Sequence, residues 1–288
     1  MAKVALAGAT ARALGAFQWV WLPAIIVCAV ATYVFASVAL IAAVGRPLAV
    51  GRTMGAQLAA AFTNRLAPAG LGAMTTEVRY LQASGESRGD AVAAVALKSL
   101  VSIAVHAIGL TAFILLATSS HAHFGVRAPG IPERWELLAF VAFGFAVVGL
   151  VVGALRFRHV WLRPIRYAYG RLLLLRAQPT RALRLAGASA GVTAAYALAL
   201  VIAVEAAGGG PLISVVAVYL GASAVGAAAP TPGGLGAVEA GLVAGLAAAG
   251  IHTGEAVTAV LIFRLVTYWA PVLPGAVSFW VLRRVGAL

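Results

Sequence analysis

Cysteine and acidic residues are scarce in this sequence. Its single cysteine, Cys28, excludes an internal disulfide. Only 8 aspartates and glutamates accompany 21 lysines and arginines, and no Ser-His-Asp set, no GK[ST] phosphate loop and no carboxylate pair on one helix face can be recognised. The histidines at 121 and 123 have no third ligand in view. The sequence therefore gives an enzyme little support, and we expect no cofactor and no metal.

Charged residues of either sign are also rare. They make up 10% of the chain, whereas 62% is hydrophobic and the mean hydropathy is +0.99, far above the roughly 45–50% apolar content of soluble domains. Eight of the 21 basic residues fall between Arg156 and Arg184, interleaved with aromatics. In so apolar a chain this cluster indicates a cytoplasmic loop on anionic lipid, and nucleic acid is not the expected partner.

Long uncharged runs predict membrane helices. The first, Phe17–Val44, is long enough to cross the bilayer at a tilt. No residue-by-residue alternation of the kind found in membrane β-barrels is present. We therefore expect an all-α integral membrane protein, a helical bundle forming one transmembrane domain over residues 1–288, with further spans at 91–119, 137–155, 186–206 and 256–282.

Two apolar regions are interrupted. Met54–Leu81 contains the break NRLAPAGLG, and Leu212–Ile251 contains the break PTPGGLG. Proline and closely spaced glycines stop a helix inside a membrane-length segment. Both regions are therefore predicted to be broken or re-entrant helices.

The two interrupted regions also match each other in sequence. Pro68-x-Gly-Leu-Gly-Ala corresponds to Pro232-x-Gly-Leu-Gly-Ala, Gly89-Asp-Ala-Val to Gly254-Glu-Ala-Val, and Lys98 lies near the counterpart of Arg264, with an offset that stays between 164 and 166 residues. A constant offset predicts an internal repeat. The expected order is repeat 1 over about 17–119, a linking span at 137–155, a basic cytoplasmic loop at 156–185 and repeat 2 over about 186–284.

Charge asymmetry predicts the orientation of these repeats. If the basic loop lies in the cytoplasm, counting the membrane crossings in both directions from it gives the two repeats opposite orientations. Arg46 and Arg52 then fall inside, as the rule requires, whereas Lys3 and Arg12 fall outside. The sequence thus predicts inverted repeats.

Inverted repeats with helices broken at mid-membrane are typical of transporters. Gly233, Gly234 and Gly236 would let backbone N–H groups approach an anion such as phosphate, and a half-helix starting near Ala237 would aim its N-terminus at it. The alternative is that these glycines only allow tight packing of a re-entrant segment.

Charges within apolar segments cost about 2.5–3.5 kcal/mol each unless they are paired or hydrated. Arg65 and Arg264 are interpreted as anion-facing; Lys98 and Glu77 are accessory candidates. Pairing of these charges to fix the bundle is the alternative. Glu239 has four open roles: capping its half-helix, stabilising an arginine, carrying a proton, or meeting an amine.

The chain resembles the lysylphosphatidylglycerol synthase transmembrane family of flippase-like proteins. The motifs that carry the resemblance are APTPGGLGAVEAGL with GEAVTAVLIFRLVTYWAPVLPG, and NRLAPAGLG with GDAVAAVALKSL. The resemblance covers nearly the whole chain from about residue 17, and implies one more span before it. Lys98 stands where an arginine is expected, which keeps the charge but loses bidentate phosphate recognition. The residues matching the family pattern are Asn64, Arg65, Pro68, Gly70, Gly72, Pro230, Pro232, Gly233, Gly234, Gly236, Glu239 and Arg264.

This resemblance implies a multi-pass protein of the bacterial plasma (inner) membrane. No soluble synthase domain accompanies the motifs, so we do not expect this chain to make the lipid. The expected function is translocation of a phosphate-bearing lipid, either an aminoacylated phospholipid or a polyprenyl-linked lipid, with anionic phospholipid or lipid-linked phosphate as the partner. The alternatives are a small-solute or ion transporter and a non-transporting subunit that docks a cytoplasmic enzyme. The many small residues suit helix packing within one chain and a homo-oligomer equally well.

Overall fold

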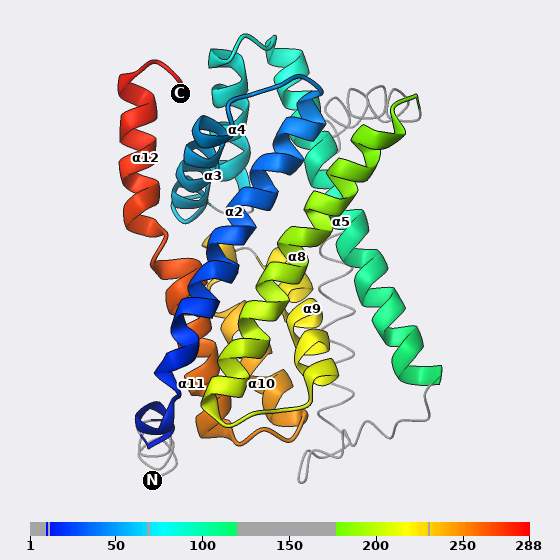
Figure 1. The fold of residues 1–288 in the computed structure, drawn as a ribbon, viewed down its shortest axis with the longest axis vertical. Helices are drawn as coiled ribbons and strands as arrows, with labels where there is room; N and C mark the ends of the chain where they lie inside the picture. The colour runs from blue at the N-terminus through cyan, green and yellow to red at the C-terminus, as the bar shows by residue number, and fades with distance from the viewer. Residues whose placement is uncertain (1–9, 11, 68–69, 120–176, 230) are drawn as a thin grey trace.

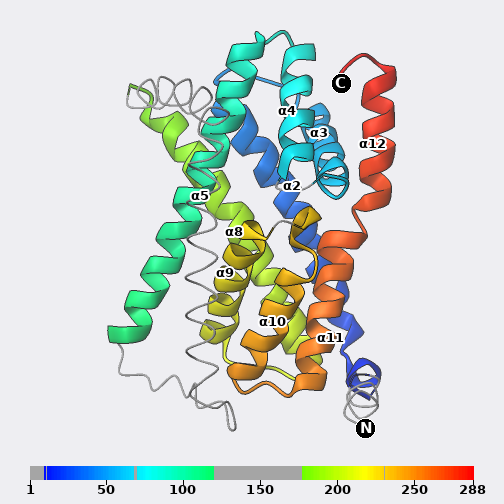
Figure 2. The same cartoon turned by 180° about the vertical axis from the view of Figure 1, so that it is seen from behind.

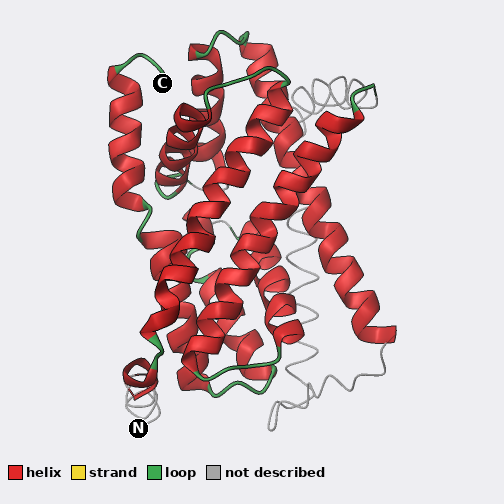
Figure 3. Ribbon diagram, in the orientation of Figure 1, coloured by secondary structure: helices red, strands yellow, loops and turns green. Residues whose placement is uncertain are grey.

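The computed structural model describes residues 10, 12–67, 70–119, 177–229 and 231–288, which form helices and turns with no strand among them (Figures 1 and 3). Four of its helical stretches are long and apolar enough to cross a membrane: Trp19–Val44, Arg88–Ala112, Pro179–Ala207 and Thr253–Arg284. They coincide with four of the five predicted uninterrupted spans, which confirms an all-helical, multi-pass organisation. The predicted span 137–155, and the basic loop as far as 176, lie outside the described residues.

Two long helices run the length of the molecule side by side. Helix α2, Leu22–Val44, follows the short turn η1 at Trp19–Trp21 and packs along α8, Pro179–Ala207. Figures 1 and 2 show both helices passing from one end of the molecule to the other. They form the frame on which the shorter helices are assembled.

Helix α8 begins earlier than the predicted start at 186. Pro179 occupies its first turn, where a missing N–H costs nothing. Arg181 then donates from Nε to the carbonyl oxygen of Ala42 at 2.6 Å and from Nη2 to that of Ala43 at 2.8 Å. The last carbonyls of α2 thereby gain a charged donor, so residues expected in the basic loop instead tie two helix ends together.

Two helical hairpins occupy the segments that the sequence predicted to be broken. The first consists of α3, Val50–Asn64, and α4, Leu71–Ala83; the second consists of α9, Leu212–Ala228, and α10, Ala237–Ala248. The turn between α9 and α10 contains a short helix, η3, at Pro232–Gly234. Figures 1 and 2 show both turns near the middle of the molecule and the open ends of the hairpins at opposite ends.

The last span is divided into three parts. Helix α11, Thr253–Arg264, continues into a π-helical turn, η4, at Leu265–Trp269, and α12, Val272–Arg284, follows. Helix α12 packs on α3, where a Cβ at Gly275 would lie 2.6 Å from the carbonyl oxygen of Leu58. Helix α5, Arg88–Ser119, contacts α2, α4, α8 and α9.

Buried apolar residues form two clusters, one around each hairpin. One cluster joins the N-terminal half of α2 and the C-terminal half of α8 to α9, α10 and α11. The other joins the remaining halves of α2 and α8 to α3, α4, α5 and the end of α12. Between the clusters α2 presents Thr32 and Tyr33, and α8 presents Val192 and Tyr196, to a cavity. The fold therefore places a more polar layer at mid-height between two apolar cores.

Basic side chains are unevenly distributed along the long axis. The ends of α2, α4 and α12 and the starts of α3, α5 and α8 lie together at the upper end in Figure 1. They carry eight arginines, with the acidic residues Glu86 and Asp90 among them: Arg46, Arg52, Arg79, Arg88, Arg181, Arg184, Arg283 and Arg284. Among the described helix ends at the opposite side, Arg12 is the basic residue, and Glu205 and Glu255 are acidic. One end of the described structure is thus strongly basic.

Candidate functional site

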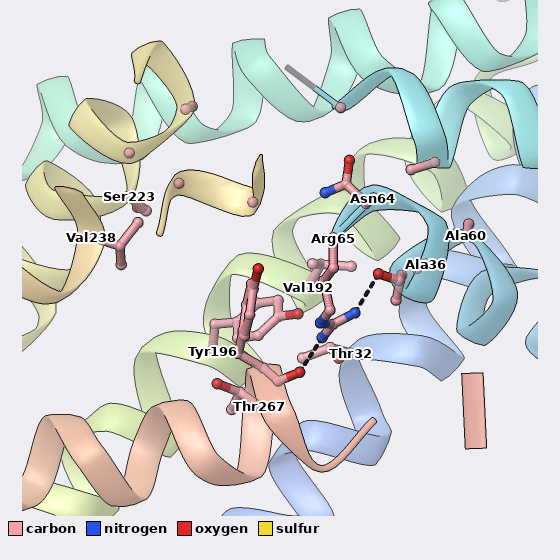
Figure 4. A pocket seen from close by; sticks show the side chains of 18 of the residues that line it. Thr32, Ala36, Ala60, Asn64, Arg65, Val192, Tyr196, Ser223, Val238 and Thr267 are labelled. Carbon is pink, nitrogen blue, oxygen red and sulfur yellow. Dashed lines mark hydrogen bonds between the residues drawn. The ribbon is translucent and has the colours of Figure 1, made fainter. Parts of the chain in front are cut away.

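A cavity of about 600 Å³ lies where the turns of the two hairpins meet. The first hairpin contributes Asn64, Arg65 and Gly70, and the second contributes Thr231, Gly233 and Gly234. Figure 4 shows Asn64 and Arg65 on one side of the cavity with Tyr196 and Thr267 across from Arg65. Residues more than 160 positions apart therefore line the same cavity.

Tyr268, in the π-helical turn η4, lies between two arginines. The guanidinium carbon of Arg65 is 4.4 Å from the centre of its ring, and that of Arg264 is 4.2 Å away. Both distances are within the range of cation–π contacts. A Cβ at Gly233 would lie 2.7 Å from the Tyr268 hydroxyl oxygen, so the second hairpin also approaches this side chain closely. Tyr268 therefore connects both hairpins to the last span.

Arg65 is held in place by backbone carbonyls. It follows the last residue of α3 and donates from Nη1 to the carbonyl oxygen of Ala61 and from Nη2 to that of Tyr268 (Figure 4). No carboxylate among the described residues pairs with it, and its Nε has no hydrogen-bond partner there. Arg65 thus brings a positive charge to the cavity that this part of the chain does not balance.

Arg264 and Glu239 form an ion pair. Arg264, 9% exposed, donates from Nε to Glu239 Oε1 at 2.6 Å. The other carboxylate oxygen accepts the backbone N–H of Gly236 at 2.8 Å, which caps the start of α10. Of the four roles considered for Glu239, the structure shows two, the helix cap and the arginine partner. Arg264 Nη2 has no partner among the described residues.

A second ion pair occupies the other half of the cavity. Lys98, on α5, donates from Nζ to Glu77 Oε1 on α4. Glu77 is only 3% exposed, and both residues line the cavity. Each ion pair joins the second helix of a hairpin to the helix that follows it. Glu77 and Lys98 therefore occupy positions in the first half that are equivalent to those of Glu239 and Arg264 in the second.

Buried polar atoms without hydrogen-bond partners are concentrated here. In the described part of the chain they belong to residues that all line this cavity: Gln57 Nε2, Asn64 Oδ1, Arg65 Nε, Thr231 Oγ1 and Arg264 Nη2. Each such atom, shielded from water, costs about 1–3 kcal/mol. A group that supplied partners for several of them would recover that cost, which makes this cavity the candidate binding site.

Two backbone amides of the second turn already have acceptors. Gly234 N–H donates to the carbonyl of Thr231 at 3.1 Å, and Gly236 N–H is bound by Glu239. A Cβ at Gly234 would lie 2.9 Å from the Gly226 carbonyl oxygen. In this conformation these two glycines serve close packing and a helix cap, so their amides are not available to an anion.

The other predicted site residues have different positions. Gly70 lines the cavity with a left-handed backbone (φ 76°) before α4. Gly72 packs against α3, where a Cβ would lie 2.1 Å from the Thr63 carbonyl oxygen. Pro232 begins η3, whereas Pro68 and Pro230 lie outside the described residues.

Gln57, Thr231 and Tyr268 are among the cavity residues that sequence reasoning missed. A helical signal existed for Gln57, which precedes Asn64 by seven residues and therefore lies on the same face of α3. Tyr268 follows Arg264 by four residues, but the π-helical turn between them shifts its direction in a way that sequence spacing does not reveal.

These observations define a multi-pass helical membrane protein with a charged cavity between two helical hairpins. Residues 2–275 match the model of the lysylphosphatidylglycerol synthase transmembrane region, and the chain belongs to this family. The resemblance inferred from the motifs is thereby confirmed. No curated protein matches the sequence.

Proposed function

We propose that this protein is a lipid translocase that moves a phosphate-bearing lipid between leaflets, with the headgroup in the cavity and the acyl chains in the bilayer. The observation that carries the proposal is the meeting of Arg65 and Arg264 on Tyr268, at the junction of the two hairpins. Guanidinium groups are the preferred partners of phosphate oxygens. Membership of the family supports a membrane lipid as the substrate.

The hairpins are proposed to be re-entrant elements of two inverted repeats. Support comes from the position of both turns near mid-height and from their opposite directions (Figures 1 and 2). Rocking of one half against the other would open the cavity alternately to each leaflet. Arg65 and Arg264, one from each half, would hold the headgroup throughout.

The arginine-rich end is proposed to face the cytoplasm of a bacterial cell. The positive-inside rule supports this orientation. A cysteine at Ser87, exposed at that end, and one at His252, exposed at the other, provide a matched pair in a chain whose native cysteine is buried. In intact cells a membrane-impermeant thiol reagent should label only the His252→Cys variant. Labelling of Ser87→Cys alone would reverse the orientation.

Transport is tested in vesicles that contain the purified protein and a fluorescent phosphatidylglycerol. The readout is the rate at which the dye becomes accessible to an external quencher. Arg264→Ala should slow this rate by about tenfold or more, the effect of one lost charge-assisted hydrogen bond. Arg284→Ala is the control, because Arg284 is exposed and stacks on Trp280 at 3.3 Å, away from the cavity lining.

Equal slowing by the two substitutions, or a wild-type rate no higher than that of protein-free vesicles, would exclude the proposal. Uptake of soluble glycerophosphoglycerol without lipid movement would favour the solute carrier instead. The docking alternative depends on the loop at 156–185, most of which lies outside the described residues.

A further inference from the structure

The charges at the cavity do not cancel. Glu77 balances Lys98, and Glu239 balances Arg264. Arg65 remains, and its partners are neutral: its Nη1 and Nη2 donate to carbonyl oxygens, and its side chain also hydrogen-bonds the Tyr33 hydroxyl. Among the described residues the cavity therefore has one positive charge in excess. Arg65 is partly buried, so an unbalanced charge there is costly, and a ligand with one negative charge offsets that cost.

The unpartnered atoms also specify the ligand. Gln57 Nε2, Arg65 Nε and Arg264 Nη2 are donors and need acceptor oxygens. Asn64 Oδ1 is an acceptor and needs a donor, whereas Thr231 Oγ1 can serve either way. Gln57 is 6% exposed and Arg264 9% exposed, so bulk water does not replace these partners. The matching ligand has several acceptor oxygens and at least one hydroxyl.

We infer that the cavity selects a phosphodiester with a single negative charge and a hydroxyl-bearing headgroup, an inference that rests on the proposed function and narrows its substrate. A phosphomonoester takes a second charge with a pKa of about 6, and a pyrophosphate carries at least two charges. An aminoacylated headgroup adds positive charge to a cavity that already has an excess. With each of these ligands bound, the cavity and the ligand together keep a net charge, whereas a singly charged phosphodiester leaves the complex neutral.

The two glutamates allow the selected charge to be changed. Glu77→Gln keeps an acceptor for Lys98 but leaves a second positive charge without balance. Glu239→Gln does the same for Arg264 and retains an acceptor for the Gly236 N–H. Both variants should shift selection toward a dianion. Arg65→Gln removes the excess charge and should abolish the preference for a monoanion over a zwitterion.

The measurement is native mass spectrometry of the delipidated full chain at pH 8. The probes are phosphatidylglycerol, phosphatidic acid and phosphatidylcholine with identical acyl chains, compared as ratios of bound lipid. Glu77→Gln should shift the ratio of phosphatidic acid to phosphatidylglycerol by about tenfold, the effect of one unit charge over about 10 Å at an effective dielectric of about 20. Glu255→Gln, at the far end of α11, is the control and should leave the ratio unchanged.

An unchanged ratio in Glu77→Gln and in Glu239→Gln would overturn the inference. If Glu77→Gln fails to fold, Glu239→Gln, whose carboxylate is less buried, decides the question. A wild type that binds phosphatidic acid more tightly than phosphatidylglycerol would also overturn it. These ratios are independent of transport, so the proposed translocation can fail in vesicles while the charge selection holds.

A final arm separates a lipid from a soluble phosphodiester with the same headgroup. Glycerophosphoglycerol is added in large excess to the protein loaded with phosphatidylglycerol. Retention of the lipid supports a lipid ligand at the cavity. Displacement of the lipid by glycerophosphoglycerol would mean that the cavity selects the same charge in a soluble substrate. That result would contradict the proposed lipid translocation but not the charge selection.

Discussion

The two hairpins each pair two helices across a turn, but the contacts between their helices differ in chemistry. In the first, Thr63 Oγ1 and Thr76 Oγ1 share a hydrogen bond of 2.8 Å between α3 and α4, close to the contact at Gly72. In the second, α9 and α10 approach through glycines packed against apolar groups, such as Gly226 against Val238. Helix pairs in membranes associate through small residues or through hydroxyl hydrogen bonds. The first hairpin depends more on a hydroxyl hydrogen bond, and the second depends more on small residues.

The ion pairs differ in a parallel way. Glu77 and Lys98 have side chains 4% and 16% exposed, whereas Glu239 and Arg264 have side chains 29% and 11% exposed. Lysine offers a compact charge, and arginine offers additional donors in a planar fork. The first pair is therefore suited to holding α4 against α5, and the second retains a free donor for a ligand. We therefore expect the same topological position to serve stability in one half and ligand recognition in the other.

The largest expected effect is a difference in stability between variants that break the two ion pairs. Lys98→Ala leaves a deeply buried carboxylate without a partner and should destabilise the protein by about 3–5 kcal/mol. Arg264→Ala exposes a carboxylate that is already partly hydrated and should cost about 1 kcal/mol, while it removes most bound phosphatidylglycerol. Melting in detergent and native mass spectrometry measure the two effects. Equal destabilisation would show that the pairs are energetically equivalent.

A second contrast concerns the contacts between the hairpin helices. Gly72→Ala drives a Cβ toward a backbone carbonyl oxygen that cannot move aside, and we expect a loss of about 3 kcal/mol. Gly226→Ala meets a Cγ2 atom of Val238 at 2.1 Å, and a rotation of that side chain should limit the loss to about 1 kcal/mol.

Gly221→Ala is the control for this contrast, since it meets nothing within 4 Å in α9 and should be neutral or slightly stabilising. The measurement is thermal unfolding of each variant in the same detergent. A greater loss for Gly226→Ala than for Gly72→Ala would contradict the expectation that a side-chain contact relaxes more easily than a backbone contact.

The smallest expected difference is between alanine substitutions in the turns of the two hairpins. Gly70 and Gly233 both have left-handed backbones, with φ 76° and 61°, and alanine at either should cost about 1–2 kcal/mol. Only Gly233→Ala also displaces the Tyr268 hydroxyl, because the nearest atom to a Cβ at Gly70 is 3.9 Å away. Gly233→Ala should therefore reduce bound phosphatidylglycerol severalfold more than Gly70→Ala, at similar melting temperatures. Equal lipid loss would mean that Tyr268 does not position the arginines.

Prediction from the sequence succeeded where one strong local signal was sufficient. Apolar length located the four long spans, and proline with glycine located both breaks, because neither signal depends on distant residues. The charges Arg65, Glu77, Lys98, Glu239 and Arg264 were recognisable because a charge in an apolar segment is rare. The start of α8 was placed too late, since its first turns are stabilised by carbonyls of α2.

By itself, the sequence determined that this is a helical membrane protein of its family, with two broken segments and a few embedded charges. Only the tertiary structure decided which charges are balanced. Glu77 and Glu239 each have a cation from a neighbouring helix, whereas Arg65 contacts carbonyl oxygens and Tyr268. Ion pairing falls off within a few ångströms, and residues 21 and 25 positions apart reach that distance only when their helices pack.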